Sequence, residues 1–328
     1  MSLHLNYDVQ QTIILPAFVD QYRSLPTAMT EPELHFVSCP DTLQGHRMAY
    51  WQWGDAAADH VVVCAHGLSR QGRDFDVLAR SLVARSKSPL QVICPDVVGR
   101  GRSDWLKDPM GYQIPIYAAD MLSMLAQIKP GRLDWVGTSM GGLIGIVLAG
   151  QPELPVPVKF RRLVLNDVGP SIRWEAIVRI GTYLGQTGRF NTLQQAADAM
   201  WAISTTFGPH TPAQWLELSR HMVRPIAASD GPVTLHYDPA IAEPIRVLTQ
   251  ESATQGEALI WQLYDAITAE TLLIRGASSD LLSLETAHAM CQSGPKARLV
   301  EFAGVGHAPT LIAPDQVDCV ADFLLARE

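Results

Sequence analysis

A serine between glycines stands in the stretch LDWVGTSMGG, residues 133–142. The residues before Ser139 are apolar and β-prone, as in a buried strand, and those after it, MGGLIGIVLAG, are apolar and long enough for a helix. A serine at such a junction needs a sharp turn, and neighbouring glycines relieve the crowding there. The turn would lift the hydroxyl above a sheet, so we predict a nucleophile. A packing turn without chemistry is the alternative until partner residues are found.

The partner that a serine needs first is a base. A hydroxyl is a weak nucleophile unless a base takes its proton, and that base must be held in the correct tautomer. Among the ten histidines, His307 in FAGVGHAPTL follows the last predicted strand and precedes the last predicted helix. His66 in CAHGLS also ends a strand but precedes the serine. We therefore predict His307 as the base and give His66 a structural or substrate-pocket role.

An acid that orients the base should end a strand between the serine and the histidine in the chain. Asp280, in TLLIRGASSDLLS, lies in a polar loop after a buried apolar strand, where a carboxylate needs a hydrogen-bond partner. Asp167, in LVLNDVGP, also closes a strand and is the rival. We favour Asp280 as the catalytic acid and expect Asp167 to hold the base of a neighbouring lid.

Two backbone N–H groups are needed to bind an oxyanion. Met140, directly after the serine, would supply one, and Leu68 in the turn HGLS would supply the other. An ordinary glycine-containing turn is the alternative for HGLS. Two arginines in the later loop GRGRSD, Arg100 and Arg102, are expected to be solvated or paired scaffold residues.

Arg70, just past the turn HGLS, is a candidate for binding a carboxylate on an acidic substrate through two parallel hydrogen bonds. The favoured alternative is a local ion pair with Asp74, Asp76 or Asp104.

Helices and strands alternate along most of the chain, which predicts an α/β fold with a parallel sheet covered on both faces. We place this core at residues 33–170 and 258–328, after an N-terminal arm at 1–32. The pattern is mostly helical between residues 171 and 257, which indicates an inserted lid over the carboxyl edge of the sheet. Trp174 and Trp201 in this lid are candidate substrate-binding residues, although aromatic residues at helical spacing are more often lid core.

Composition limits the classes of function. The chain has 328 residues, 47% of them hydrophobic and 18% charged, with a net charge of −8 and no basic block. Nucleic acid and anionic membranes are therefore not expected partners. Of the five cysteines, Cys64 and Cys94 lie in apolar strand-like runs, so free thiols and a reducing, cytoplasmic location are expected. No signal peptide or membrane-length apolar run is evident.

Five motifs together resemble the α/β-hydrolase family, whose chain order of serine, acid and histidine they share. In chain order they are HGLS (66–69), DVVGRGRSD (96–104), GTSMGG (137–142), LIRGASSD (273–280) and GVGHAPTL (304–311). The resemblance implies a mostly parallel, twisted sheet of eight strands, helices on both faces and a helical lid. Relatives that remove halides or open epoxides carry Asp at the position of Ser139, so those activities are not expected.

The expected function is hydrolysis of an ester, thioester or lactone bond of a small, partly apolar substrate, through an acyl-enzyme on Ser139. A C–C bond hydrolase or an acyltransferase of the same fold is the alternative, and a non-catalytic ligand-binding protein is a third. Relatives that cleave C–C bonds often have a loop richer in glycine than HGLSRQ. No metal or organic cofactor is expected, and the expected partners are the substrate and, as an open alternative, further copies of the chain.

Overall fold

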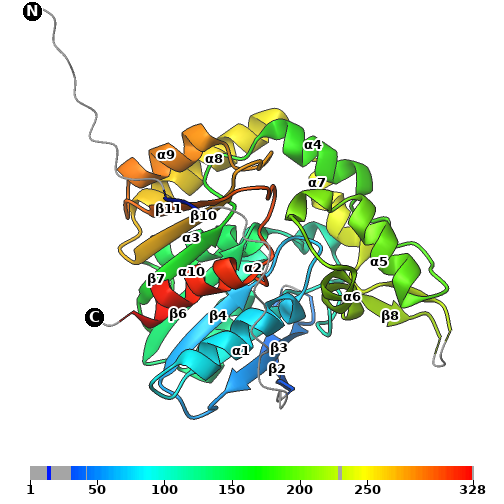
Figure 1. Cartoon of the computed structure of the whole chain (residues 1–328), viewed down its shortest axis with the longest axis horizontal. Helices are drawn as coiled ribbons and strands as arrows, with labels where there is room; N and C mark the ends of the chain where they lie inside the picture. The colour runs from blue at the N-terminus through cyan, green and yellow to red at the C-terminus, as the bar shows by residue number, and fades with distance from the viewer. Residues whose placement is uncertain (1–12, 16–30, 42, 228–230, 327–328) are drawn as a thin grey trace, which may run out of the picture.

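The computed structural model describes residues 13–15, 31–41, 43–227 and 231–326. Its centre is a nine-stranded sheet of order β1-β11-β10-β7-β6-β4-β5-β3-β2 (Figure 1). All strands run in one direction except β3, which is antiparallel to both of its neighbours. The strands are β1 (Ile13–Leu15), β2 (Glu33–Cys39), β3 (His46–Gly54), β4 (His60–Ala65), β5 (Gln91–Asp96), β6 (Arg132–Thr138), β7 (Phe160–Asn166), β10 (Glu270–Gly276) and β11 (Arg298–Phe302).

The predicted α/β fold is confirmed. The eight expected strands are β2 to β7, β10 and β11, and β1 adds a ninth beside β11. Apart from β1, the predicted N-terminal arm at 1–32 lies almost entirely outside the described residues.

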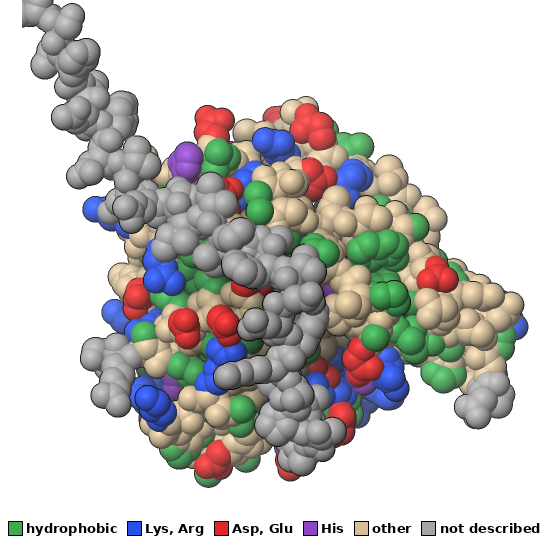
Figure 2. Space-filling model, in the orientation of Figure 1, with side chains coloured by type: hydrophobic (Ala, Val, Ile, Leu, Met, Phe, Trp, Pro, Cys, Tyr) green, Lys and Arg blue, Asp and Glu red, His purple; other side chains and the backbone are tan. Residues whose placement is uncertain are grey.

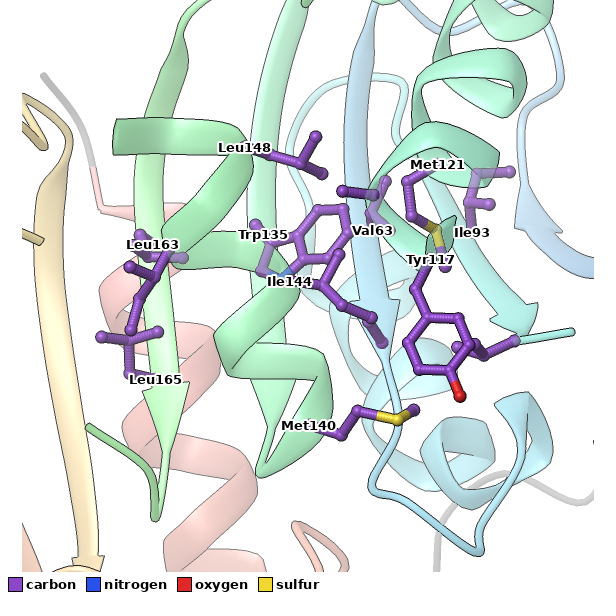
Figure 3. Packing of buried hydrophobic residues seen from close by; sticks show 14 of the residues in the cluster. Val63, Ile93, Tyr117, Met121, Trp135, Met140, Ile144, Leu148, Leu163 and Leu165 are labelled. Carbon is purple, nitrogen blue, oxygen red and sulfur yellow. The ribbon is translucent and has the colours of Figure 1, made fainter. Parts of the chain in front are cut away.

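Helices cover both faces of the sheet and bury two hydrophobic clusters. Successive strand residues point to opposite faces, so Trp135 belongs to one cluster and Val136 to the other. Figure 3 shows Trp135 beside Ile144 of α3. A Cβ on Gly145 would lie 2.6 Å from Trp135 Nε1, so glycine lets this helix approach the sheet. One face carries α1 (Asp76–Arg85) and α10 (Pro314–Leu325), and the other carries α2 (Ile114–Ile128), α3 (Met140–Gly150) and α9 (Leu284–Gln292).

A mostly helical insertion lies between β7 and β10, beside the sheet, at the position predicted for the lid, and it is called the lid below (Figure 1). It contains α4 (Trp174–Tyr183), α5 (Leu193–Ala202), α6 (Pro212–Arg220), β8 (Val223–Pro225), β9 (Val233–Leu235) and α7 (Glu243–Arg246). The next helix, α8 (Gln250–Asp265), packs along α3 of the core. The lid boundary predicted at residue 257 therefore falls inside a helix that already belongs to the core packing.

The surface carries charges of both signs. On the face drawn in Figure 2, acidic and basic side chains of the described residues are interspersed. Cys64 and Cys94 are free and fully buried, as expected for small hydrophobic side chains. Within the described ranges, no helix has the length and apolar character needed to cross a bilayer.

Candidate active site

Ser139 lies in the predicted turn between β6 and α3. Its φ of 52° and ψ of −116° put a non-glycine residue in an unfavourable region of backbone space, which persists only when the surroundings enforce it. The Ser139 N–H donates to the Asn166 carbonyl over 3.0 Å. A Cβ on Gly141 would lie 2.0 Å from the Ala65 carbonyl oxygen, and one on Gly137 would lie 2.3 Å from the Gly141 carbonyl oxygen. The glycines on both sides of the serine are therefore required by close backbone approach.

His307 connects Ser139 to a buried carboxylate. Its Nε2 lies 3.0 Å from Ser139 Oγ, and its Nδ1 lies 2.7 Å from Asp167 Oδ2. An ionised carboxylate can only accept, so Nδ1 carries the proton and Nε2 is free to accept one from the serine hydroxyl. Asp167 is fully buried and also accepts from the Gly276 N–H at 2.9 Å and from Ser279 Oγ at 2.7 Å. These bonds fix the carboxylate and thereby the imidazole ring.

The prediction of Asp280 as the partner of His307 is wrong in this structure. Asp280 Oδ2 instead accepts a hydrogen bond from Arg179 Nε at 2.8 Å, and 44% of its side chain is exposed. Asp167 directly follows β7, whereas Asp280 lies four residues beyond the end of β10. Both aspartates lie between Ser139 and His307 in the chain and follow neighbouring strands, so chain order does not distinguish them. The rival aspartate is the one that reaches the histidine.

The predicted oxyanion donors lie on the two turns that meet at Ser139. A Cβ on Gly67 would lie only 3.7 Å from Ser139 Cβ, so the HGLS loop runs directly beside the serine. Within the described residues, neither the Leu68 N–H nor the Met140 N–H donates to a protein acceptor. Met140 is the first residue of α3, where backbone N–H groups point outward and favour negative charge.

A cavity of ≈ 140 Å³ lies beside the serine, between the core loops and the lid. Ser139, His307 and Leu68 line it from the core. Its apolar wall comes from the lid and includes Ile180, Leu184, Met200, Phe207 and Leu235. The arrangement can hold a small, partly apolar molecule against the hydroxyl.

The candidate substrate-binding residues have different positions. Arg70 lines the cavity, but Asp74 binds it through two hydrogen bonds, from Arg70 Nε at 2.6 Å and Nη2 at 2.8 Å, as the ion-pair alternative predicted. Trp201 packs against Trp215 with ring centroids 5.0 Å apart, inside the lid. Trp174 begins α4 and is partly buried. Neither Trp174 nor Trp201 is among the described residues that line the cavity.

Comparison with known proteins identifies the family of this chain. The sequence profile of the alpha/beta hydrolase family matches residues 62–318. The chain belongs to this family. The 3-hydroxybutyrate-oligomer hydrolase of Cupriavidus necator is 47% identical over 293 residues, which are 89% of this chain and 97% of that protein.

Two further relatives extend the comparison. The crystal structure of an alpha/beta hydrolase from Novosphingobium aromaticivorans has a TM-score of 0.76 and 34% identity, over 90% of this chain and 99% of the other. The 2-hydroxy-6-oxo-2,4-heptadienoate hydrolase of Pseudomonas putida is 24% identical over 77% of this chain and 84% of its own length.

One residue of this hydrolase was not expected at the site. Arg100 is fully buried, and the hydrogen bonds of its guanidinium go to neutral groups of the described residues. Its Nε donates to the Leu68 carbonyl at 2.8 Å, its Nη1 to the Tyr117 hydroxyl at 3.0 Å, and its Nη2 lies 3.7 Å from Met140 Sδ. The guanidinium therefore contacts both residues that the sequence predicts as oxyanion donors. Arg102, two positions on, is exposed as expected.

We expect Arg100→Met to lower kcat about 10- to 100-fold with little change in KM. The variant removes the donor that holds the Leu68 carbonyl and a buried positive charge near the developing oxyanion, and such effects act on the transition state. Ester hydrolysis by the purified variant checks this, with Arg102→Met as the matched exposed control. A folded Arg100→Met protein with wild-type kcat would contradict the positioning role.

His66 lines the cavity, as its predicted pocket role requires, and it also bonds to the backbone of the surrounding loops. It is fully buried, its Nε2 accepts from the Val97 N–H at 3.0 Å, and its Nδ1 donates to the Gly67 carbonyl at 2.7 Å. Burial lowers the pKa of His66 to about 3, partly opposed by the bond to Gly67. The imidazole is therefore neutral at physiological pH, and both of its nitrogens are occupied.

The low pKa of His66 makes stability depend on pH. An unfolded histidine takes up a proton below about pH 6.5, whereas folded His66 does so only near pH 3. The unfolded state thus binds more protons in this window, and the free energy of unfolding falls with decreasing pH by up to about 1.4 kcal/mol per pH unit from this residue. Urea denaturation of wild type and His66→Gln between pH 7.5 and 5 should give a shallower decline for the variant. Parallel declines would show that His66 is not the source.

Proposed function

We propose that this protein hydrolyses esters of short hydroxy acids, in particular linear 3-hydroxybutyrate oligomers, through an acyl-enzyme on Ser139. The observation that carries the proposal is the hydrogen-bonded series from Ser139 Oγ through His307 to the buried Asp167. The substrate class comes from the 47% identical relative, which this chain matches over 97% of that protein's length.

The chemistry assigned to these residues proceeds in two steps. Ser139 Oγ attacks the ester carbonyl while His307 Nε2 takes its proton, and the Leu68 and Met140 N–H groups bind the oxyanion. His307 then protonates the leaving alcohol, and the C–O bond of the ester breaks to leave an acyl-enzyme. Water, deprotonated by His307, attacks the acyl group and releases the hydroxy acid and the free serine. The Asp167 carboxylate stabilises the imidazolium in both steps.

The size and lining of the cavity support a short acyl group. Its volume of ≈ 140 Å³ is close to that of a cavity of about 150 Å³ that accommodates benzene. A short hydroxyacyl unit fits such a space, which supports a preference for short acyl groups over long ones. The lid supplies the apolar wall, whereas the core supplies the reacting groups.

Product analysis with linear 3-hydroxybutyrate dimer and trimer tests the proposal. We expect release of 3-hydroxybutyrate, and faster turnover of p-nitrophenyl butyrate than of p-nitrophenyl laurate. The second candidate is C–C bond hydrolysis, since the Pseudomonas putida relative acts on an unsaturated oxo acid according to its name. A dienoic oxo-acid substrate should therefore be assayed in parallel. If the protein turned over the dienoic oxo acid but neither the 3-hydroxybutyrate oligomers nor the p-nitrophenyl esters, the ester proposal would be overturned in favour of the C–C reaction.

A further inference from the structure

Two arginines line the cavity beside Ser139, and they differ in how their hydrogen-bonding capacity is used. Arg70 makes two bonds to Asp74 and is only 12% exposed. Arg179, on lid helix α4, is 40% exposed and meets Asp280 through Nε alone. Asp280 Oδ1 has no hydrogen-bond partner among the described residues. The Arg70 guanidinium is thus held by a protein carboxylate, whereas the end of Arg179 that carries both terminal amino groups is not.

We propose that Arg179 binds the free carboxylate of the substrate, so that the preferred substrates are esters of hydroxy acids with an ionised carboxyl end. This inference rests on the proposed ester hydrolysis and adds the charge of the substrate to it. A guanidinium whose Nε is engaged still presents two parallel N–H donors, one from each terminal amino group, which match the two oxygens of a carboxylate. Asp280 contacts the arginine through Nε, and the guanidinium also interacts with the Tyr183 hydroxyl, which lines the same cavity.

The surroundings of Arg179 fit this role. Tyr183 lies one helical turn further along α4 and also lines the cavity. Burial raises the pKa of Tyr183, partly opposed by Arg179, so its hydroxyl stays protonated and can donate a second hydrogen bond. An ion pair as exposed as that of Arg179 and Asp280 contributes little to stability. The pair nevertheless holds a cation in the wall of the cavity that Ser139 and His307 also line.

A fixed cation would also select the bond that is cleaved. A linear hydroxybutyrate oligomer has one carboxylate, at one end, and ester bonds at regular intervals from it. With the carboxylate on Arg179, the ester bonds near that end are the ones that reach Ser139. The inference therefore predicts cleavage from the carboxyl end of the oligomer and weak use of oligomers whose carboxyl group is blocked.

Arg179→Gln is the variant that tests the proposal, with the 3-hydroxybutyrate dimer, its methyl ester and p-nitrophenyl butyrate as substrates. We expect KM for the anionic dimer to rise about 10- to 100-fold, as for the loss of charge-assisted hydrogen bonds, and values for the two neutral esters to stay unchanged. Arg220→Gln, which removes an exposed lid arginine paired with Glu217, is the matched control and should change none of them.

The outcomes separate this inference from the proposed function. Equal losses on all three substrates would mean that Arg179 joins the lid to the core, and the carboxylate role would be overturned. Unchanged KM for the dimer in Arg179→Gln would also overturn it, while hydrolysis of the neutral esters would leave the ester-hydrolase proposal standing. A folded wild-type protein that hydrolyses none of the three would instead contradict the proposed function itself.

Discussion

Replacing Asp167 with Asn is expected to lower kcat/KM for p-nitrophenyl butyrate about 10⁴-fold, the loss typical of such a change in a serine hydrolase. The Asn amide is nearly isosteric, but it can donate to His307 Nδ1 where the carboxylate only accepts. The ring proton then moves to Nε2, which faces Ser139 Oγ and can no longer accept the hydroxyl proton. Steady-state kinetics and a thermal melt measure the loss and check that the variant is folded.

Asp280→Asn is the matched control for this prediction. Asp280 also follows a sheet strand, but it contacts Arg179 rather than His307. We expect its kcat/KM on the neutral ester to stay close to the wild-type value. If Asp280→Asn were inactive and Asp167→Asn active, His307 would have to exchange one carboxylate for the other during turnover, and the assignment made from these distances would be wrong.

The sequence predicted the serine and the histidine for reasons that the structure bears out in their geometry. A serine between an apolar strand and an apolar helix, with glycines around it, can form only a sharp turn, and Ser139 has the positive φ of such a turn. His307 follows the last strand of the core, where loops converge on the same sheet edge. For the acid, the chain order leaves Asp167 and Asp280 equivalent. They are distinguished only in the folded chain, where Asp167 at the end of β7, and not Asp280 after the neighbouring β10, contacts His307.

The cavity wall was harder to predict because apolar periodicity marks both the inside of a lid and the side that faces a substrate. Trp201 and Trp215 pack edge to face within the lid, whereas Ile180 and Phe207 line the cavity. Arg100 was misjudged for a related reason, since charged loop residues are usually solvated or paired. Burial of its guanidinium depends on Tyr112 and Tyr117, whose rings lie 5.7 and 5.0 Å from it.

The ninth strand, Ile13–Leu15, has only three residues, too few for an alternating pattern to predict a strand. Its pairing with β11 is set by a neighbour almost 300 positions away in the chain. The lid boundary predicted at residue 257 lies within α8 (Gln250–Asp265), because this helix continues the polar and apolar spacing of the lid helices. Its packing on α3, rather than its own sequence, makes it part of the core.

Ser139→Ala is expected to cause the largest loss, about 10⁶-fold in kcat, and to abolish labelling by a fluorophosphonate probe. The reason is that no other described side chain with a nucleophilic oxygen lies within hydrogen-bond distance of His307 Nε2. Activity and labelling of the purified variant check this, and a thermal melt shows whether the turn at residue 139 still folds.

The double variant Ser139→Ala/Asp167→Asn gives a sharper test than either single change. Residues that act as one unit show non-additive losses, because the acid matters only through the histidine and the histidine only through the serine. We therefore expect the double variant to be no slower than Ser139→Ala alone. A further 10⁴-fold loss in the double variant would mean that Asp167 acts on a reaction that bypasses Ser139, for instance direct attack by water on the substrate. The hydrogen bonds from Ser139 through His307 to Asp167 would then describe a structural network, and the acyl-enzyme mechanism would have to be abandoned.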